Sequence, residues 1–303
     1  MKAIRLHAST LQLPSKWEDL SFNDTLYTIG ILHLLLKKEI PPEIARMQML
    51  LRYTRYRPSL LLLLREAITK NREEREIIHF NLLRLSEQLT FAFEVKEQQI
   101  IPHLTFATNP LPCVVLNHKK DRGKKFELDI TAKTDLTARE FIDCFDLMSL
   151  YNSIQTETDK QSCINQLCCI LYPRLPDYKQ NLVCGHHKHM QLLSPARKLC
   201  ILYWFVGVVQ FYATHPVYEL LFKKHTGTDD DPDDKIHIGM NEIALFLRKE
   251  GYGSPDTMNL NDFFDAQIKS LKDFIATAMA AGVKIEQIAG KTGLSLSTIY
   301  KLS

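Results

Sequence analysis

The chain has 303 residues, of which 45% are hydrophobic and 24% are charged, a composition typical of a globular protein with a sizeable core. Its net charge of +3 is too small for a protein that coats nucleic acid or a membrane surface. The most apolar run, residues 199–213, is shorter than the roughly twenty residues that cross a bilayer, and the N-terminus lacks a signal-peptide segment. We therefore expect a cytoplasmic protein without a membrane partner.

The first ninety residues predict several packed helices. Ser15 and Ser21 are candidate caps for a first helix that ends before Pro41. Pro42 suits the first turn of a second helix, which we expect to reach about residue 56. After Pro58 the apolar pattern restarts, and residues 73–88 have one apolar side, as in an amphipathic helix.

The apolar period changes at residue 90. Phe91, Phe93 and Val95 alternate with other residues and predict a β-hairpin that continues to about residue 106. Short strands are expected at 3–6 and at Cys113–Leu116, whereas the basic stretch 117–125 predicts a solvated loop. The β-structure therefore forms an insertion near residues 90–130.

Helix signals return at residue 137. Thr137-Ala-Arg-Glu140 is a capping box, a second helix covers about 159–172, and Ser194-Pro195 begins the apolar helix of residues 199–213. Residues 226–237 are acidic and predict a solvated linker. This linker separates a helical body at 1–225 from a C-terminal unit at 238–303.

The C-terminal unit begins with a short helix at 241–250, closed by Gly251. Asn261 is expected to cap a longer helix that Gly282 ends. Because this helix leads into a helix-turn-helix pattern at 284–303, the terminal unit is predicted to be trihelical. The predicted fold class is mainly α, with a multi-helix body, a small β-hairpin insertion and this C-terminal unit.

The last twenty residues predict a helix, a tight turn and a second helix. Ala289 is small where two helices would cross, and Gly293 can take the left-handed backbone of the turn. The segment resembles the helix-turn-helix at the C-terminus of resolvase-type recombinases, whose pattern runs Ile-Ala-x-x-x-Gly-Leu/Val-Ser-x-Ser-Thr-Ile/Val-Tyr. It departs from that pattern at Leu296, where the family often has arginine. The expected mini-core consists of Ile285, Ile288, Leu294, Ile299 and Leu302.

The resemblance implies contact with duplex DNA, because the second helix of such a unit lies in the major groove. Lysines and the amides at the start of the last helix would hold phosphates, and polar side chains on that helix would read bases. From residue 266 onward, five lysines and two acidic residues give a local charge of +3. The predicted DNA-binding residues are Lys284, Lys291, Ser295, Ser297, Thr298, Tyr300 and Lys301.

The segment Tyr53-Thr-Arg55-Tyr-Arg57-Pro-Ser59 superficially resembles the nucleophile region of serine recombinases. The spacing differs from that family, and the surrounding pattern is helical, whereas the family places the motif at the end of a strand. We therefore interpret these residues as a junction between two helices, with no recombinase chemistry.

The segment Cys184-Gly-His186-His187-Lys-His189 contains side chains that bind zinc. Adjacent histidines point apart and no Cys-x-x-Cys pair is present, so we predict a solvated loop and no metal or cofactor, while metal binding at these four residues stays an open alternative. The seven cysteines of the chain lack a disulfide spacing and predict reduced thiols. No known catalytic motif occurs, so the sequence gives little indication of an enzyme. A metal-assisted enzyme at the histidine cluster is a third possibility, and it requires further ligands from the helix of residues 163–169.

Loose motifs in the first 220 residues resemble uncharacterised proteins from prophages and mobile elements of Bacteroidetes. They are Leu13-Pro-Ser-Lys-Trp17-x-x-Leu20-Ser21, Asn109-Pro110, Leu171-Tyr172 and Tyr203-Trp204-Phe205. This resemblance implies a phage or mobile-element setting. The predicted function is non-enzymatic DNA binding, as an oligomer or with a partner because one such unit binds weakly. The alternative is a phage tail-assembly or chaperone-type protein whose C-terminal helices contact a phage structural protein.

Overall fold

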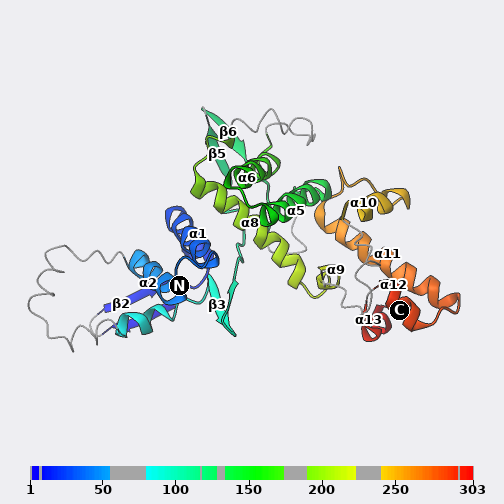
Figure 1. Ribbon diagram of the computed structural model, residues 1–303, viewed down its shortest axis with the longest axis horizontal. Coiled ribbons are helices and arrows are strands. Elements are labelled where there is room, and N and C mark those ends of the chain that lie inside the picture. Colours follow the sequence, from blue (N-terminus) through cyan, green and yellow to red (C-terminus); the bar gives the residue numbers. More distant parts are fainter. Residues whose placement is uncertain are drawn as a thin grey trace, which may run out of the picture. The chain divides into compact units, whose positions relative to one another are not determined.

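The computed structural model describes residues 2–6, 9–54, 80–116, 118–127, 134–173, 190–222, 240–292 and 294–302. These residues are mainly helical, as predicted, and include three two-stranded antiparallel sheets (Figure 1). The chain divides into two compact units. The first consists of Met1–Leu111 and Leu192–Gly207, and the second of Pro112–Gln191 and Val208–Ser303.

The first unit combines short helices with two hairpins. Its elements are β1 (Lys2–Leu6), β2 (Ser9–Leu13), the 3-10 turn η1 (Trp17–Asp19), α1 (Phe22–Leu36), α2 (Pro42–Tyr53), β3 (Phe93–Lys96) and β4 (Gln99–Pro102). Strands β3 and β4 form the hairpin that the alternation after residue 90 predicts. Of the two candidate caps, Ser21 caps α1 by accepting a hydrogen bond from the Asp24 amide at 3.2 Å, whereas Ser15 binds the Asp19 carboxylate.

Two contacts hold the chain after β4 in the first unit. The indole N–H of Trp17 donates a 2.7 Å hydrogen bond to the His103 carbonyl, and the Trp17 ring packs on Phe106 with 4.4 Å between centroids. A Cβ atom on Gly207 would lie 2.2 Å from the carbonyl oxygen of Leu104. Only glycine therefore allows the long helix containing residue 207 to approach this segment so closely.

The second unit is almost entirely helical. Its elements are β5 (Cys113–Leu116), β6 (Lys119–Arg122), α5 (Ala138–Ser153), α6 (Glu157–Leu171), the end of α8 (Pro195–Thr214), α9 (Glu219–Phe222), α10 (Met240–Lys249), α11 (Leu260–Ala280), α12 (Ile285–Thr292) and α13 (Leu296–Leu302). The predicted strand Cys113–Leu116 and the predicted start of α8 at Pro195 are confirmed.

The prediction of a solvated loop at 117–125 is wrong. Lys119–Arg122 forms β6, which pairs with β5 from Cys113 opposite Arg122 to Leu116 opposite Lys119. His118, directly before β6, has a φ of 63°, the left-handed backbone that tight hairpin turns require. The backbone pairing thus overrides the strongly charged side chains of this strand.

The capping box at the start of α5 is confirmed. The Thr137 amide donates to Oε2 of Glu140 at 2.9 Å, and the Glu140 amide donates to the Thr137 hydroxyl at 3.3 Å. The Glu140 side chain is only 1% exposed, and its other oxygen lies 2.8 Å from the ammonium of Lys124. Because a buried carboxylate requires a partner, we assign Lys124 a structural role in stabilising this cap.

The prediction that Asn261 caps the long C-terminal helix is also wrong. The cap of α11 is Asn259, whose side chain accepts from the Asp262 amide at 3.0 Å. Asn259 also pairs with Thr137 in an isolated β-bridge, which fixes where the helix begins. Asn261 lies inside the helix and accepts a hydrogen bond from the Tyr212 hydroxyl.

The predicted acidic linker at 226–237 lies outside the described residues, so the predicted boundary there stays a prediction. Residues on both sides of it belong to the second unit. Arg139 of α5 donates a 2.7 Å hydrogen bond to Asn241 of α10, and the Ala138 amide donates to the Met258 carbonyl at 2.9 Å. Helix α10 and the start of α11 are thereby attached to α5.

The interior of the described chain is mostly apolar, and none of its helices is long and apolar enough to cross a membrane.

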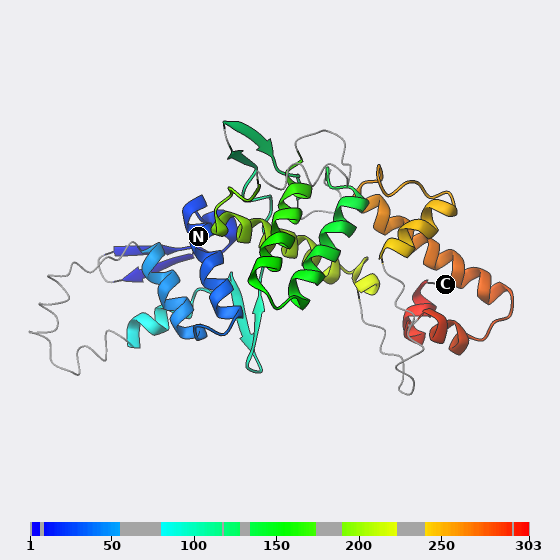
Figure 2. The same ribbon diagram turned by 45° about the horizontal axis from the view of Figure 1, so that its top comes forward.

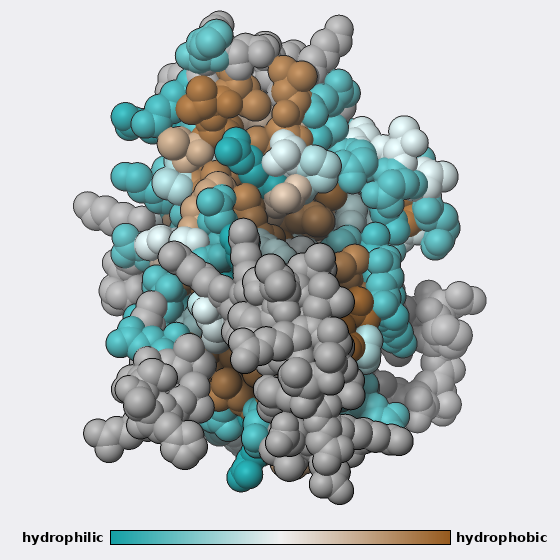
Figure 3. All heavy atoms as spheres, turned by 90° about the vertical axis from the view of Figure 1, so that its left-hand side faces the viewer, coloured by the Kyte–Doolittle hydropathy of each residue, from teal (hydrophilic) through white to brown (hydrophobic). Residues whose placement is uncertain are grey.

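The cysteines at 144, 163, 168, 169 and 200 are buried and not in disulfides, as predicted, while Cys184 lies outside the described residues. On the face shown in Figure 3, hydrophilic and hydrophobic side chains lie side by side, as on most protein surfaces.

Candidate functional site

The end of α11 forms a separate trihelical unit with α12 and α13, drawn in orange to red in Figure 2. Its core consists of Ile275, Ile288 and Ile299, one from each helix and each 0% exposed. Partly buried residues surround them: Leu271, Ala278, Met279, Val283, Ile285, Ala289, Leu294 and Leu302. All members of the predicted mini-core lie in this cluster, as does Ala289, the small residue expected between the helices.

Helix α11 ends at a glycine-based cap, as predicted. Gly282 has a φ of 74°, a conformation that glycine adopts at little cost. The Val283 amide donates to the Ala278 carbonyl and the Gly282 amide to the Met279 carbonyl, each at 3.0 Å. These are the two bonds of a Schellman motif, which turns the chain sharply toward α12.

Ser295 caps the last helix, and its hydroxyl accepts from the Thr298 amide at 3.2 Å. The same hydroxyl lies 2.8 Å from the Thr298 hydroxyl and 2.9 Å from the Ser297 hydroxyl. Gly293, the predicted turn residue, lies outside the described residues. Of the predicted DNA-binding residues, Ser295, Ser297 and Thr298 therefore contact one another through their hydroxyls at this cap, and the Thr298 amide has a partner within the protein.

The remaining side chains of α13 divide into an inner and an outer side. Ile299 is buried and Leu302 is partly buried, whereas Ser297, Tyr300 and Lys301 are exposed. Because successive helical residues are rotated by about 100°, the three exposed side chains lie on one side of the helix. Leu296, which sequence reasoning did not assign to the site, lies on the same side.

The trihelical unit also carries three lysines on or next to α12 and α13. Lys284 precedes α12, Lys291 lies in its last turn and Lys301 in the last turn of α13, and all three are exposed. Within the part of the chain that the structure describes, no carboxylate forms an ion pair with any of them. Their ammonium groups are accessible to an anionic partner.

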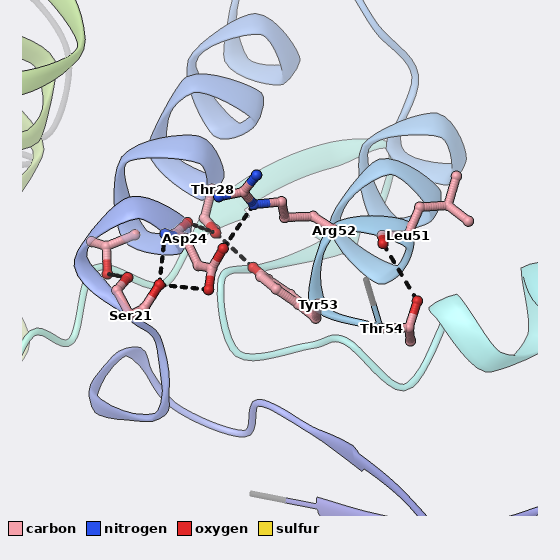
Figure 4. A network of polar contacts seen from close by, with 8 residues as sticks. Ser21, Asp24, Thr28, Leu51, Arg52, Tyr53 and Thr54 are labelled. Carbon is pink, nitrogen blue, oxygen red and sulfur yellow. Dashed lines mark hydrogen bonds and ion pairs between the residues drawn. The ribbon is translucent and has the colours of Figure 1, made fainter. Parts of the chain in front are cut away.

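A second region that the sequence raises is the end of α2 at Tyr53. Figure 4 shows the Tyr53 hydroxyl directed at Thr28 of α1, with 2.6 Å between the oxygens. Arg52 forms a 2.7 Å ion pair with Asp24 beside it. Burial raises the pKa of Tyr53 well above its ordinary value. This arrangement ties α2 to α1 and holds the phenol in its neutral form, while Arg55, Arg57 and Ser59 lie outside the described residues.

The predicted loop with Cys184, His186, His187 and His189 lies outside the described residues, and metal binding there stays untested. Within the described ranges no group of three or more His, Cys, Asp or Glu side chains is placed to hold a metal ion. In the trihelical unit, by contrast, all the predicted DNA-binding residues lie in the described part of the chain.

Comparison of the chain with family models, with curated proteins and with solved structures found no match.

Proposed function

We propose that the chain is a non-enzymatic DNA-binding protein of a phage or mobile element and that α13 enters the major groove of duplex DNA. The observation that carries this proposal is the two-sided burial of α13. Ile299 is fully buried in the small core, while Ser297 and Tyr300 on the outer side are exposed. A reading helix needs this arrangement, because its inner side must be fixed while its outer side meets base edges.

The charges of the unit support the same function. Lys284, Lys291 and Lys301 can contact phosphates, which fix the register of a protein on DNA without reading sequence. One such unit is expected to bind DNA only weakly. It offers three phosphate contacts, and it is smaller than the surface that specific protein–DNA complexes bury. We therefore propose that two or more copies, or one copy with a partner, bind the DNA together.

The test measures binding of the full-length protein to a fluorescent duplex of about 30 base pairs over a salt range of about 50 to 200 mM. Affinity should fall steeply with salt, and Lys284→Gln, Lys291→Gln and Lys301→Gln should each lower the slope of log K against log salt by up to about 0.9. Lys16→Gln is the matched control, because Lys16 is exposed in the first unit. No binding at the lowest salt would contradict the proposal.

A second candidate function is docking of the C-terminal helices on a phage structural protein during assembly. It is favoured by the exposure of two large side chains on α13, Leu296 at 45% and Tyr300 at 64%. Such docking would depend on apolar burial and would be largely insensitive to salt. The same salt titration therefore separates the two candidates.

A further inference from the structure

We infer that α13 reads DNA through the 5-methyl groups of thymine, with Leu296 as the specificity-determining residue. This inference rests on the proposed function. It concerns which bases the helix distinguishes, whereas the lysines of the unit account for binding to any duplex.

The first turn of α13 carries none of the side chains that make strong polar contacts with bases. Guanine is usually read by arginine or lysine, adenine by asparagine or glutamine, and cytosine by acidic side chains. Residues 296–299 are Leu, Ser, Thr and Ile. The Ser297 and Thr298 hydroxyls both contact the cap hydroxyl of Ser295, and Ile299 is buried. Serine contacts any base, so Ser297 discriminates weakly.

Leu296 is the remaining side chain, and its position fits the role. It is the first residue of α13, and the N-terminal residues of a reading helix are those that reach base edges. Its side chain is 45% exposed and lies outside the isoleucine core. In the major groove the thymine methyl is the apolar group that distinguishes one base pair from another, so it is the natural contact for this side chain.

Tyr300 extends the apolar surface by one turn. Residues four apart lie on the same face of a helix, so Leu296 and Tyr300 form an apolar strip, with Ser297 and Lys301 on the adjacent polar side. The strip consists of only two side chains, so its apolar area is small. A stable protein interface buries about 800 Å² on each partner. Together with the flanking lysine, this small area favours a DNA groove over a protein partner.

The experiment compares two duplexes that differ only in thymine methyl groups. The full-length protein is titrated against an A·T-rich duplex and against the same duplex with every thymine replaced by deoxyuridine, at one salt concentration. Phosphates and base-pairing groups are identical in the two probes. We expect the wild-type protein to bind the deoxyuridine duplex about fourfold more weakly for each methyl group that it buries.

Leu296→Ala is the decisive variant. It should bind the two duplexes with equal affinity, because the side chain that contacts the methyl group has been removed. Leu296 is not a member of the isoleucine core, and an unchanged thermal unfolding transition checks that the variant folds. Leu150→Ala is the matched control, because Leu150 is exposed to a similar degree, 49%, on α5 outside the proposed site, and it should keep the full difference between the probes.

The outcomes separate this inference from the function on which it rests. Salt-dependent binding with equal affinity for both probes would overturn the role of Leu296 and leave DNA binding intact. A difference that persists in Leu296→Ala would also overturn it. Absence of binding to either duplex would overturn both proposals, and an oligomeric state that changes in Leu296→Ala would then assign the strip to a protein contact.

Discussion

The two halves of α11 take part in different kinds of core. The first half contains Phe263 and Phe264, both 0% exposed. The ring of Phe264 lies 4.5 Å from that of Tyr212 and 5.5 Å from that of Phe141, between centroids, and so joins α11 to α8 and α5. The second half contributes Ile275 to the small core with α12 and α13. One helix thus belongs both to a large aromatic scaffold and to a small terminal unit.

The two regions differ in how many buried side chains hold them and in how many side chains they leave exposed. The aromatic core draws large side chains from several elements, so many contacts share the burial of each ring. The terminal unit is held by three isoleucines and their partly buried neighbours, which leaves most side chains of α12 and α13 at the surface. Because fewer buried contacts hold it, we expect the terminal unit to unfold at a lower free energy than the aromatic core.

The largest effect is expected from breaking the aromatic core. Phe264→Ala removes a fully buried ring and should lower the free energy of unfolding by about 3 to 5 kcal/mol, measured by urea denaturation. Phe274→Ala is the matched control on the same helix, because Phe274 is 44% exposed, and it should change stability by about 0.5 kcal/mol or less. Equal effects of the two variants would contradict the role assigned to this core.

A smaller and more local effect is expected in the terminal unit. Ile299→Ala leaves a cavity in the isoleucine core and should cost about 2 to 4 kcal/mol. Since α13 packs through this residue, the loss should appear as faster hydrogen exchange in α12 and α13, with little change in α5. The proposed DNA binding should be lost with it. The substitution Gln287→Ala, at an exposed residue of α12, should leave the exchange of both helices unchanged, and protection that survives in Ile299→Ala would argue against a separate unit.

Local signals in the sequence were sufficient for much of this architecture. The capping box at Thr137, the proline at the start of α8, the strand at Cys113–Leu116 and the glycine that ends α11 all act through neighbouring residues. The isoleucine core was predictable for the same reason, because its members recur at helical spacing within about thirty residues.

Features set by distant contacts could not be predicted. Lys119–Arg122 becomes a strand because its backbone pairs with β5, which its charged side chains do not indicate. Asn259 caps α11 in place of Asn261 and is also bridged to Thr137, more than a hundred residues away in the sequence. Tertiary pairing of this kind cannot be predicted from local patterns.

The smallest of the three predicted effects concerns how the free energy of unfolding depends on pH. It arises in the aromatic core, because this core contains buried tyrosines. The Tyr218 hydroxyl donates a 2.7 Å hydrogen bond to Asp265. Burial, together with donation to this carboxylate, raises the pKa of Tyr218 in the folded protein, and burial likewise raises that of Tyr212. The folded state therefore favours the neutral phenols.

Because the unfolded phenols ionise near pH 10, the stability that this pKa difference provides is complete below that pH and is lost as pH rises above it. Tyr218→Phe should cost about 1 kcal/mol at neutral pH through the lost hydrogen bond. Above pH 10 its free energy of unfolding should fall less steeply with pH than that of the wild-type protein, because one ionising group is absent. Urea denaturation at neutral pH and above pH 10 measures both effects, and Tyr212→Phe should reduce the steepness in the same direction. If the pH dependence of the free energy of unfolding is unchanged in both variants, the aromatic core does not hold these phenols neutral. The two ends of α11 would then not differ in how their stability depends on pH.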